Sequence, residues 1–355
     1  MLRNQRIGQF EIKIRNVHRR LRSPARLHVA TRLQFSRSVF DVIIIGGGPA
    51  GLSAALVLAR CRRRVLLCDA GQPRNARSSA LHGFLSRDCI PPMELLRLGR
   101  EELRPYGVEP RNVTVTNLAH TGGFFEATLD DHQTVRARMA LIATGVRDHV
   151  PDIPGLQECY GVTVHHCPYC DGWEHRDQAI VVIGRGTSGA GLALSLKTWT
   201  SRVVLCTNGT RLIRPHDRQQ LDREGIEVHA SRIVRVEHDG PVVRGMAFAN
   251  GASIHCEAIF FSERQRQQCD LAARLGCEMN RGGVVKTGNL GQTHLPGLYV
   301  VGDASRDVQF AIVAAAEGAK AAVAINKALQ ARAGLTVVPQ DTDGRTSTRP
   351  DSARA

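Results

Sequence analysis

Apolar and polar positions along residues 39–71 fall into blocks that predict a strand, a helix and a second strand. Residues 39–45 are apolar except for Asp41, residues 49–60 carry apolar side chains at helical spacing, and residues 65–68 are apolar again. Short continuous apolar runs are typical of strands buried on both faces of a parallel sheet. Because the glycines lie in the turn between the first strand and the helix, the order is that of a nucleotide-binding unit.

The same order of blocks returns at residues 179–206. An apolar run at 179–183 is followed by a turn with glycines, an apolar-periodic helix and a second apolar run at 202–206. We interpret the two segments as an internal repeat of a nucleotide-binding unit. The sequence therefore predicts the α/β fold class with two Rossmann-like dinucleotide-binding domains.

The remaining segments predict further strands, one long helix and a tail. Residues 138–155 read as a strand that runs into a proline-marked linker, and residues 226–261 alternate polar and apolar positions as antiparallel strands do. A strand within 295–305 ends in Gly-Asp, and an alanine-rich helix follows at 310–329. Residues 333–355 are small, polar and charged, and we expect a disordered tail there.

The net charge of +14 is concentrated in residues 1–38. This segment holds ten Arg or Lys and one acidic residue, so it accounts for nine of the fourteen net positive charges. A mitochondrial transit peptide is Arg-rich and poor in acids, but no clear amphipathic repeat or cleavage signal stands out. We therefore favour an unstructured arm on a cytoplasmic protein, with a mitochondrial location as the alternative. Nucleic-acid binding through the arm is a weaker interpretation, and we do not expect a nucleic-acid partner.

Cysteine content and hydrophobic runs argue against two classes of protein. Ten cysteines in 355 residues are too sparse for a disulfide-stapled secreted domain, so a reducing compartment fits best. No apolar run reaches the length of a membrane helix. The longest candidate, residues 310–325, carries Glu317 and Lys320, so we expect no membrane association.

The first glycine turn has the spacing Gly46-x-Gly48-x-x-Gly51. In such a fingerprint the first glycine permits a tight turn, the second lets backbone amides approach a pyrophosphate, and the third lets helix and strand pack closely. The positive end of the helix dipole then faces the phosphates. Asp69 ends the second strand, where a carboxylate can accept a hydrogen bond from a ribose hydroxyl. The pattern predicts a dinucleotide site.

The second glycine turn repeats this spacing as Gly184-x-Gly186-x-x-Gly189, but no acidic residue ends the strand that follows its helix. Its second strand ends in Cys-Thr-Asn-Gly at 206–209, with neither an acid for an NAD ribose nor an adjacent arginine pair for an NADP phosphate. We predict a nicotinamide nucleotide here. A nucleotide fold that has lost its nucleotide is the alternative, because function depends on the site and not on the fold.

Cys167 and Cys170 form the only Cys-x-x-Cys motif of the chain. A structural zinc ion needs four ligands, commonly from two such pairs. His165, His166 and His175 could in principle complete a site, but adjacent histidines rarely converge on one metal. We therefore predict no metal site.

A redox pair needs two sulfurs close enough to bridge, one thiolate of lowered pKa and a source of electrons. Cys167 and Cys170 lie just before the second nucleotide-binding unit, where a flavin held by the first unit could be reached. Asp171 follows directly and could exchange protons with the dithiol. The alternative for Asp171 is a turn residue before Gly172.

Taken in order, the motifs resemble those of the low-molecular-weight thioredoxin reductases, an FAD/NAD(P) disulfide oxidoreductase family. The resemblance covers about residues 39–330. The motifs that carry it are the fingerprint at 46–51, Ala143-Thr144-Gly145, Cys167-x-x-Cys170-Asp171-Gly172, the fingerprint at 184–189 and Gly302-Asp303.

The resemblance implies that an NAD(P) domain carrying the Cys-x-x-Cys motif is inserted into an FAD domain. The implied cofactors are FAD together with NADPH or NADH. The implied partner is a thioredoxin-like protein or a small disulfide or dithiol, and the family implies a homodimer. The implied organisation is a basic extension at 1–38, the FAD domain at 39–152 and 270–332, the NAD(P)-like domain at 153–269 and the tail at 333–355.

The resemblance also implies residue roles, one position at a time. For FAD, Gly46, Gly48, Gly51 and Asp69 would hold the pyrophosphate and ribose, Thr144 and Gly145 would pass nearby, Gly302 and Asp303 would approach the ribityl chain, and Gln309 and Ala311 would lie against the isoalloxazine. Gly184, Gly186 and Gly189 would hold the nicotinamide nucleotide. Cys170 would face the flavin, Cys167 would attack the substrate disulfide, and Asp171 would donate the proton.

Three departures from the family pattern bear on the direction of the reaction. The basic cluster for an NADP phosphate is replaced by Thr-Asn-Gly at 207–209, and the acids that usually follow the second fingerprint are replaced by Ala-Gly-Leu-Ala at 190–193. The segment 167–174 is closer to a branch that contains the gliotoxin-type dithiol oxidases, although those tend to carry histidine where this chain has Asp171. We predict a disulfide reductase driven by NAD(P)H. The alternative is a dithiol oxidase that reduces oxygen to peroxide without nicotinamide.

Overall fold

The computed structural model describes residues 39–210, 213–305 and 308–335. The predicted extension at 1–38 and residues 336–355 of the predicted tail lie outside these residues. A membrane-crossing helix is not found in this described part, because none of its helices is both long enough and apolar enough.

The first sheet combines strands from both ends of the described chain. Its order is β3-β2-β1-β6-β5-β4, with β17 also paired to β6. The strands are β1 Phe40–Ile45, β2 Val65–Asp69, β3 Arg111–Asn112, β4 Val115–Thr121, β5 Phe124–Leu129, β6 Thr134–Ile142 and β17 Leu298–Val300. β2, β1, β6 and β17 pair in parallel, whereas β4, β5 and the start of β6 pair antiparallel. The late strand β17 therefore completes a sheet that the early strands begin.

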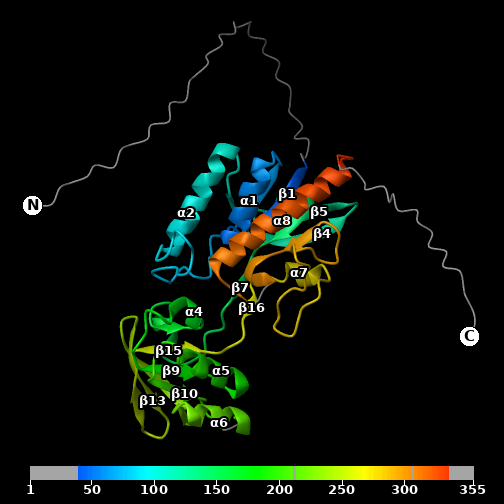
Figure 1. Ribbon diagram of the computed structural model, residues 1–355. Helices are drawn as coiled ribbons and strands as arrows, with labels where there is room; N and C mark the ends of the chain where they lie inside the picture. The colour runs from blue at the N-terminus through cyan, green and yellow to red at the C-terminus, as the bar shows by residue number, and fades with distance from the viewer. Residues whose placement is uncertain (1–38, 211–212, 306–307, 336–355) are drawn as a thin grey trace, which may run out of the picture. The chain divides into compact units, whose positions relative to one another are not determined.

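Helices cover one face of this sheet. They are α1 Pro49–Arg60, α2 Pro92–Leu103 and α8 Ala311–Arg332, and η1 Arg104–Tyr106 continues α2. α8 lies beside α1, and the two share a core with the apolar side chains of the sheet (Figure 1). The approach is close, since a Cβ atom on Gly318 of α8 would lie 2.0 Å from the backbone oxygen of Ala50. The small residues of α8 are therefore a packing feature. The opposite face of the sheet packs against α7 Leu271–Arg274 and the segment after it.

The second sheet is entirely parallel, in the order β11-β10-β9-β15-β8. Its strands are β8 Val164–His165, β9 Ile180–Ile183, β10 Val203–Cys206, β11 Glu227–His229 and β15 Ala258–Phe261. α5 Gly186–Leu196 and α6 Pro215–Arg223 pack on one face. A small antiparallel sheet of β12 Ile233–Asp239, β13 Val242–Phe248 and β14 Ser253–His255 packs on the other. Covered faces explain why β9 and β15 are buried at every position.

The prediction of antiparallel strands over residues 226–261 is right only for β12, β13 and β14. β11 and β15 lie inside the predicted range but pair in parallel with β10 and β9. For β15 the reason is burial, because this strand is apolar and buried throughout and lies in the interior of the parallel sheet, whereas β12 buries only Ile233 and Val236.

The elements of the second sheet lie, in chain order, between β6 and β17 of the first. The chain leaves the first sheet through β7 Val146–Arg147 and returns through β16 Arg266–Gln267, and these two short strands pair antiparallel. α3 Leu156–Cys159, α4 Pro168–Asp171 and η2 Gly302–Ala304 complete the described elements. This topology confirms the predicted fold class, with one Rossmann-like unit inserted into another. The predicted domain boundaries stay a prediction.

Candidate functional site

A cavity of about 460 Å³ lies at the carboxyl ends of the parallel strands β1 and β2. In open α/β sheets, this edge is where ligands bind. The cavity brings together segments that are far apart in the sequence, including the cysteine motif. Its lining contains these predicted site residues: Gly46, Gly48, Asp69, Thr144, Gly145, Cys170, Asp171, Gly302, Asp303, Gln309 and Ala311.

Five predicted site residues do not line this cavity. Gly51 lies in the first turn of α1, where a Cβ atom would lie 1.8 Å from the carbonyl oxygen of Gly46, so its contact is with the strand-to-helix turn. Cys167 is bonded to Cys170 but is absent from the lining. The other three, Gly184, Gly186 and Gly189, lie at the junction of β9 and α5 in the second sheet.

The first glycine turn has the shape of a phosphate cradle. Gly46 has φ +112°, and a Cβ atom there would lie 2.3 Å from the carbonyl oxygen of Ala143, so the turn can form only with glycine. Gly48 is the N-cap of α1 and has open space where a Cβ atom would stand. Backbone amides at a helix N-terminus beside open space suit an anionic group.

Asp69 lies at the end of β2, on the edge of the same cavity. Its Oδ1 accepts a hydrogen bond from the amide of Gly71 at 3.0 Å, and its Oδ2 lies 2.6 Å from Nη2 of Arg100. The glycine turn and this fixed carboxylate are the two groups needed for the pyrophosphate and ribose of a dinucleotide. These residues therefore fit such a cofactor.

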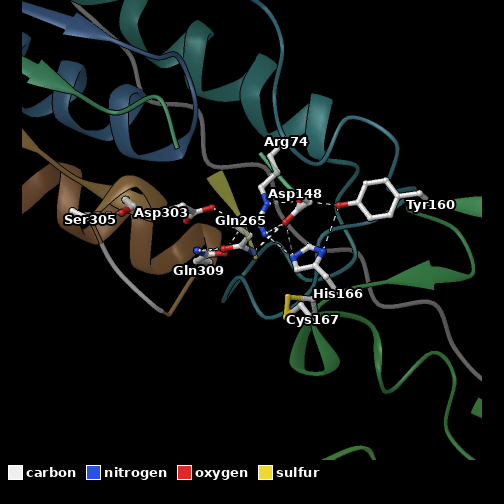
Figure 2. Close-up of polar contacts among 11 residues, drawn as sticks. Arg74, Asp148, Tyr160, His166, Cys167, Gln265, Asp303, Ser305 and Gln309 are labelled. Atoms are coloured by element: carbon white, nitrogen blue, oxygen red, sulfur yellow. Dashed lines mark hydrogen bonds and ion pairs between the residues drawn. A yellow bond between two sulfur atoms is a disulfide. The ribbon is translucent and has the colours of Figure 1, made fainter. Parts of the chain in front are cut away.

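Arg74 is the centre of a polar network at the other end of the cavity (Figure 2). Its Nη2 lies 2.5 Å from Oδ1 of Asp148 and 2.7 Å from Nε2 of His166. Its Nη1 lies 2.9 Å from Oδ2 of Asp303 and 2.6 Å from Oε1 of Gln309. The guanidinium group of Arg74 thus connects Asp303, which follows strand β17 of the first sheet, to His166, which precedes Cys167.

The protonation states of the network follow from its contacts. Burial opposes ionisation of Asp148, but its contacts with Arg74 and His166 hold the pKa of this carboxyl below its usual value. Burial and the neighbouring Arg74 charge lower the pKa of His166 to about 4, so the ring is neutral at neutral pH. Its Nε2 then accepts from Arg74, which leaves the proton on Nδ1, facing the hydroxyl of Tyr160 at 3.4 Å. The Tyr160 hydroxyl donates in turn to Asp148 at 2.7 Å.

Gln265, which follows β15, connects this network to the returning chain. Nε2 of Gln309 donates to Oε1 of Gln265 at 2.6 Å, and Nε2 of Gln265 donates to Oδ1 of Asp148 at 3.0 Å. Asp303 carries a raised pKa because burial outweighs the attraction of Arg74. The predicted pair Asp303 and Gln309 is therefore positioned by three residues that the sequence analysis did not identify, Arg74, Asp148 and Gln265.

Cys167 and Cys170 form a disulfide across the first turn of α4, with 5.3 Å between their Cα atoms. Cys167 is the N-cap of α4 and Cys170 contributes to the cavity lining. In this disulfide state neither sulfur is available as a thiolate ligand for zinc. A redox-active disulfide that faces a dinucleotide cavity is the chemistry that this arrangement supports.

The neighbouring histidines make their own contacts behind this pair. Nδ1 of His165 lies 3.3 Å from Oδ1 of Asp171, and Nε2 of His165 lies 2.9 Å from Nε2 of His175. Burial raises the pKa of Asp171, but the hydrogen bond and charge of His165 outweigh it, so the pKa is lowered. Burial lowers the pKa of His175.

A separate group brings three possible metal ligands together within the described residues. Ligand atoms of His82, Asp88 and Cys89 lie within 4.8 Å of one another. Asp88 and Cys89 are exposed, and surface groups of this kind are common without an ion.

The second glycine turn lies in surroundings unlike those of the first. Thr187, in the first turn of α5, donates to Oδ2 of Asp217 at 2.8 Å. Asn208, just after β10, accepts a hydrogen bond from the amide of Ile233 at 2.9 Å. By strand register, the position that corresponds to Asp69 is Thr207, and its hydroxyl donates a hydrogen bond to the carbonyl oxygen of Thr210, so it is also engaged within the protein.

Comparisons with known proteins agree with this geometry. The family model described as pyridine nucleotide-disulphide oxidoreductase matches residues 40–318. The "Probable thioredoxin reductase" of Arthroderma benhamiae is 31% identical over 301 residues, which cover 76% of this chain and 74% of that protein. The crystal structure of HlmI is 36% identical with a TM-score of 0.80 and covers 83% of this chain and 94% of its own. The oxidoreductase from Agrobacterium tumefaciens is 33% identical with a TM-score of 0.77, covering 82% and 99%.

Proposed function

The chain belongs to the pyridine nucleotide-disulphide oxidoreductase family, as a thioredoxin reductase-like enzyme, and on that premise we propose that it is an FAD-dependent disulfide reductase supplied by NADPH or NADH. The observation that carries the proposal is that Cys170 lines the same cavity as the first glycine turn and Asp69. A dinucleotide held at that turn would extend along the cavity toward the sulfur.

The residues that would hold FAD are those that line the cavity. The amides around Gly46 and Gly48 would bind the pyrophosphate, and Asp69 would accept from a ribose hydroxyl. Asp303, Gln309 and Ala311 would lie along the other half of the cofactor. FAD supplies hydride and electron transfer when it is bound, and the protein supplies position and electrostatics.

The protein's own chemistry is thiol–disulfide exchange. Reduction of the disulfide gives two thiols, and the thiolate of Cys167 attacks one sulfur of the substrate disulfide. The substrate S–S bond breaks, a mixed disulfide forms, and the thiolate of Cys170 then attacks Cys167 to release the second substrate thiol. Asp171 takes and returns the protons of these steps.

The Arg74 network would keep the cysteine segment in register with the cavity. Arg74 contacts Asp303 on one side and His166 on the other, and His166 precedes Cys167 in the chain. Arg74 also pairs with the buried carboxylate of Asp148. Loss of Arg74 would leave this carboxylate without its cation, which is costly. Arg74 is therefore proposed as a residue that orients the cysteine segment toward the cofactor site.

The substrate would be a thioredoxin-like protein or a small disulfide. Support comes from relatives named thioredoxin reductase, such as the protein of Arthroderma benhamiae. We also propose a homodimer, as the family resemblance implies, and a cytoplasmic location, as the cysteine content and the interpretation of residues 1–38 suggest.

A dithiol oxidase is the second candidate, and the second glycine turn favours it. Asn208 accepts from the amide of Ile233, and the carboxylate of Asp217 holds Thr187 at the start of α5. Neither arrangement provides the charge that would select a nicotinamide nucleotide. In this alternative a substrate dithiol reduces the Cys167–Cys170 disulfide, and oxygen is the final electron acceptor.

Anaerobic flavin reduction separates the two candidates. We expect NADPH or NADH to bleach the flavin absorbance of the purified protein within a turnover. Bleaching by a dithiol and by neither nucleotide, with peroxide formed in air, would favour the oxidase. The variant Cys170→Ser should retain FAD and lose disulfide turnover; turnover that persists in this variant would refute the cysteine assignment.

A further inference from the structure

Behind the disulfide lies a buried hydrogen-bonded chain of one acid and two histidines. His165 ends β8 and is 5% exposed, and His175 is 8% exposed. Nδ1 of His165 faces Oδ1 of Asp171 at 3.3 Å, and its Nε2 faces both the carbonyl oxygen of Val162 at 3.1 Å and Nε2 of His175 at 2.9 Å. Nδ1 of His175 lies 2.8 Å from Oε1 of Gln178.

The contacts of His165 determine how many protons the chain holds. A carbonyl oxygen can only accept a hydrogen bond, and so can an ionised carboxylate. With Asp171 ionised, both nitrogens of His165 face acceptors, so the arrangement accommodates a proton on each of them. Asp171 and His165 together can therefore hold one proton more than a carboxylate beside a neutral imidazole.

The carboxyl group is not where this extra proton is stored. The hydrogen bond and charge of His165 lower the pKa of Asp171 even though burial acts in the opposite direction. An ionised Asp171 alone would have no proton to give to a leaving thiolate at neutral pH. The adjoining imidazole supplies what the carboxyl lacks.

His175 allows the pair to lose this proton without leaving His165 unpaired. While the proton is present, Nδ1–H of His175 donates to Gln178, and its Nε2 is an acceptor. After the proton leaves, His165 keeps Nδ1–H toward Asp171, and its Nε2 accepts from Nε2–H of His175. Nδ1 of His175 then accepts from the amide nitrogen of Gln178 after a half-turn of that amide. Because the histidine and glutamine side chains stay paired in both states, the cost of switching is small.

Building on the proposed disulfide exchange, we propose that His165 is a positioning residue that stores the proton exchanged by Asp171, with His175 as its tautomeric partner. As the sulfur of Cys167 attacks the substrate disulfide, the substrate S–S bond breaks and the mixed disulfide forms. The Asp171–His165 pair gives its stored proton to the departing sulfur and takes up the thiol proton of Cys167 in its place. The same exchange accompanies the attack of Cys170 on Cys167. Overall the protein dithiol becomes a disulfide, the substrate disulfide becomes two thiols, and the pair is unchanged.

The dependence of the reaction rate on the leaving group tests for proton transfer, because a merely structural role of His165 would affect all disulfide substrates alike. A thiol of low pKa leaves readily as a thiolate, whereas an alkyl thiol leaves better when a proton is supplied. Two disulfides therefore serve as probes: 5,5′-dithiobis(2-nitrobenzoate), which releases an aromatic thiolate, and bis(2-hydroxyethyl) disulfide, which releases an alkyl thiolate. The protein is reduced with dithiothreitol, desalted without air and mixed with each probe in a stopped-flow instrument.

His165→Asn is the decisive variant, because asparagine keeps an N–H near Asp171 but cannot hold an extra proton. We expect the rate with the alkyl disulfide to fall at least about tenfold and the rate with the aromatic disulfide to change by less than about twofold. His175→Gln should show the same split to a smaller extent, and it replaces the first variant if that one does not fold. His216→Asn, at the exposed start of α6, is the matched control and should change neither rate.

Equal slowing with both probes would mean that His165 only supports the fold, and no slowing would mean that it has no part in proton transfer. Either result overturns the inference. Because the assay starts from chemically reduced thiols, its result does not depend on whether NADPH or NADH reduces the flavin. A failure of the proposed function in the anaerobic flavin experiment is therefore distinguishable from a failure of this inference.

Discussion

The two glycine turns have the same spacing and different surroundings. The turn at 46–51 lines a cavity with Asp69 at the end of β2, where a carboxylate faces a prospective ribose. The turn at 184–189 lies outside that cavity, and the side chain of Asn208 after β10 is used to bind the amide of Ile233. The difference teaches that strand–turn–helix spacing specifies the fold, whereas ligand choice depends on the next strand end and on loops that arrive from elsewhere.

The cavity of the first unit also holds a charged network, to which the second unit contributes Tyr160, His166 and Gln265. Arg74 reaches Asp148, His166 and Asp303 from the loop after β2. This network brings the cysteine segment, which belongs to the second unit in chain order, to the cavity of the first. Through Cys170, the cysteine pair therefore borders the cavity of the first unit.

The largest expected effect is that of a substitution at Gly46 in the first glycine turn. Gly46→Ala places a Cβ atom 2.3 Å from the carbonyl oxygen of Ala143 and strains a backbone with φ +112°. We expect the free energy of unfolding to fall by about 3 kcal/mol or more and bound FAD to be lost. Denaturant titration and the flavin absorbance of the purified protein measure both effects.

Gly191→Ala is the matched control in the second unit. Gly191 lies exposed within α5 with no atom near its Cβ position, so alanine should raise the free energy of unfolding by about 0.5–1 kcal/mol. A Gly46→Ala protein that is as stable and as yellow as the wild type would show that the first turn is no tighter than an ordinary loop.

Strand and helix positions were predictable because local patterns carry them. The predicted helix at 49–60 has the observed bounds of α1, where proline follows the glycines and apolar residues keep helical spacing. The predicted helix at 310–329 corresponds to α8 at Ala311–Arg332. The pairing of β11 and β15 was not predictable, because a short run shows its polarity but not its neighbour.

The cavity network could not be predicted for a different reason. Arg74 lies 74 positions from Asp148, 92 from His166 and 229 from Asp303 along the chain. No periodicity or motif links residues at such separations, so only the folded chain brings them together. His165 and His175 are close in sequence, but they were considered only as possible metal ligands and set aside, so their hydrogen-bonded chain with Asp171 was not predicted.

The second largest expected effect is a dependence of stability on pH that comes from His166 in the first site. His166 has a pKa of about 4 in the folded protein, against 6.5 as its ordinary value. Between these values the unfolded chain binds more protons than the folded one, so the free energy of unfolding falls as the pH is lowered from 6.5 to 4. We expect a loss of roughly 2–3 kcal/mol from this residue. Denaturant titrations at several pH values measure it.

His166→Gln tests whether His166 causes this loss of stability, because the glutamine oxygen can still accept a hydrogen bond from Arg74 but does not titrate. The variant should lose less stability than the wild type between pH 6.5 and 4. His216→Gln, an exposed substitution in the second unit, should keep the wild-type dependence. An unchanged dependence in His166→Gln would assign the acid sensitivity to other groups.

The smallest effect concerns the side chains at the two strand ends, and it bears most directly on the difference between the two glycine turns. Asp69→Asn keeps an acceptor for the Gly71 amide but removes the charge, so FAD affinity should fall about tenfold, as expected for one charge-assisted hydrogen bond. Asn208→Ala removes the acceptor for Ile233 and should lower the free energy of unfolding by about 1 kcal/mol without changing FAD affinity. FAD titration of the apoprotein, followed by flavin fluorescence, measures the FAD affinity of both variants.

If Asn208→Ala weakened FAD binding as much as Asp69→Asn, the two strand ends would not be functionally distinct. The contrast would then have to be sought in the loops that bring Arg74 and Asp303 to the first turn.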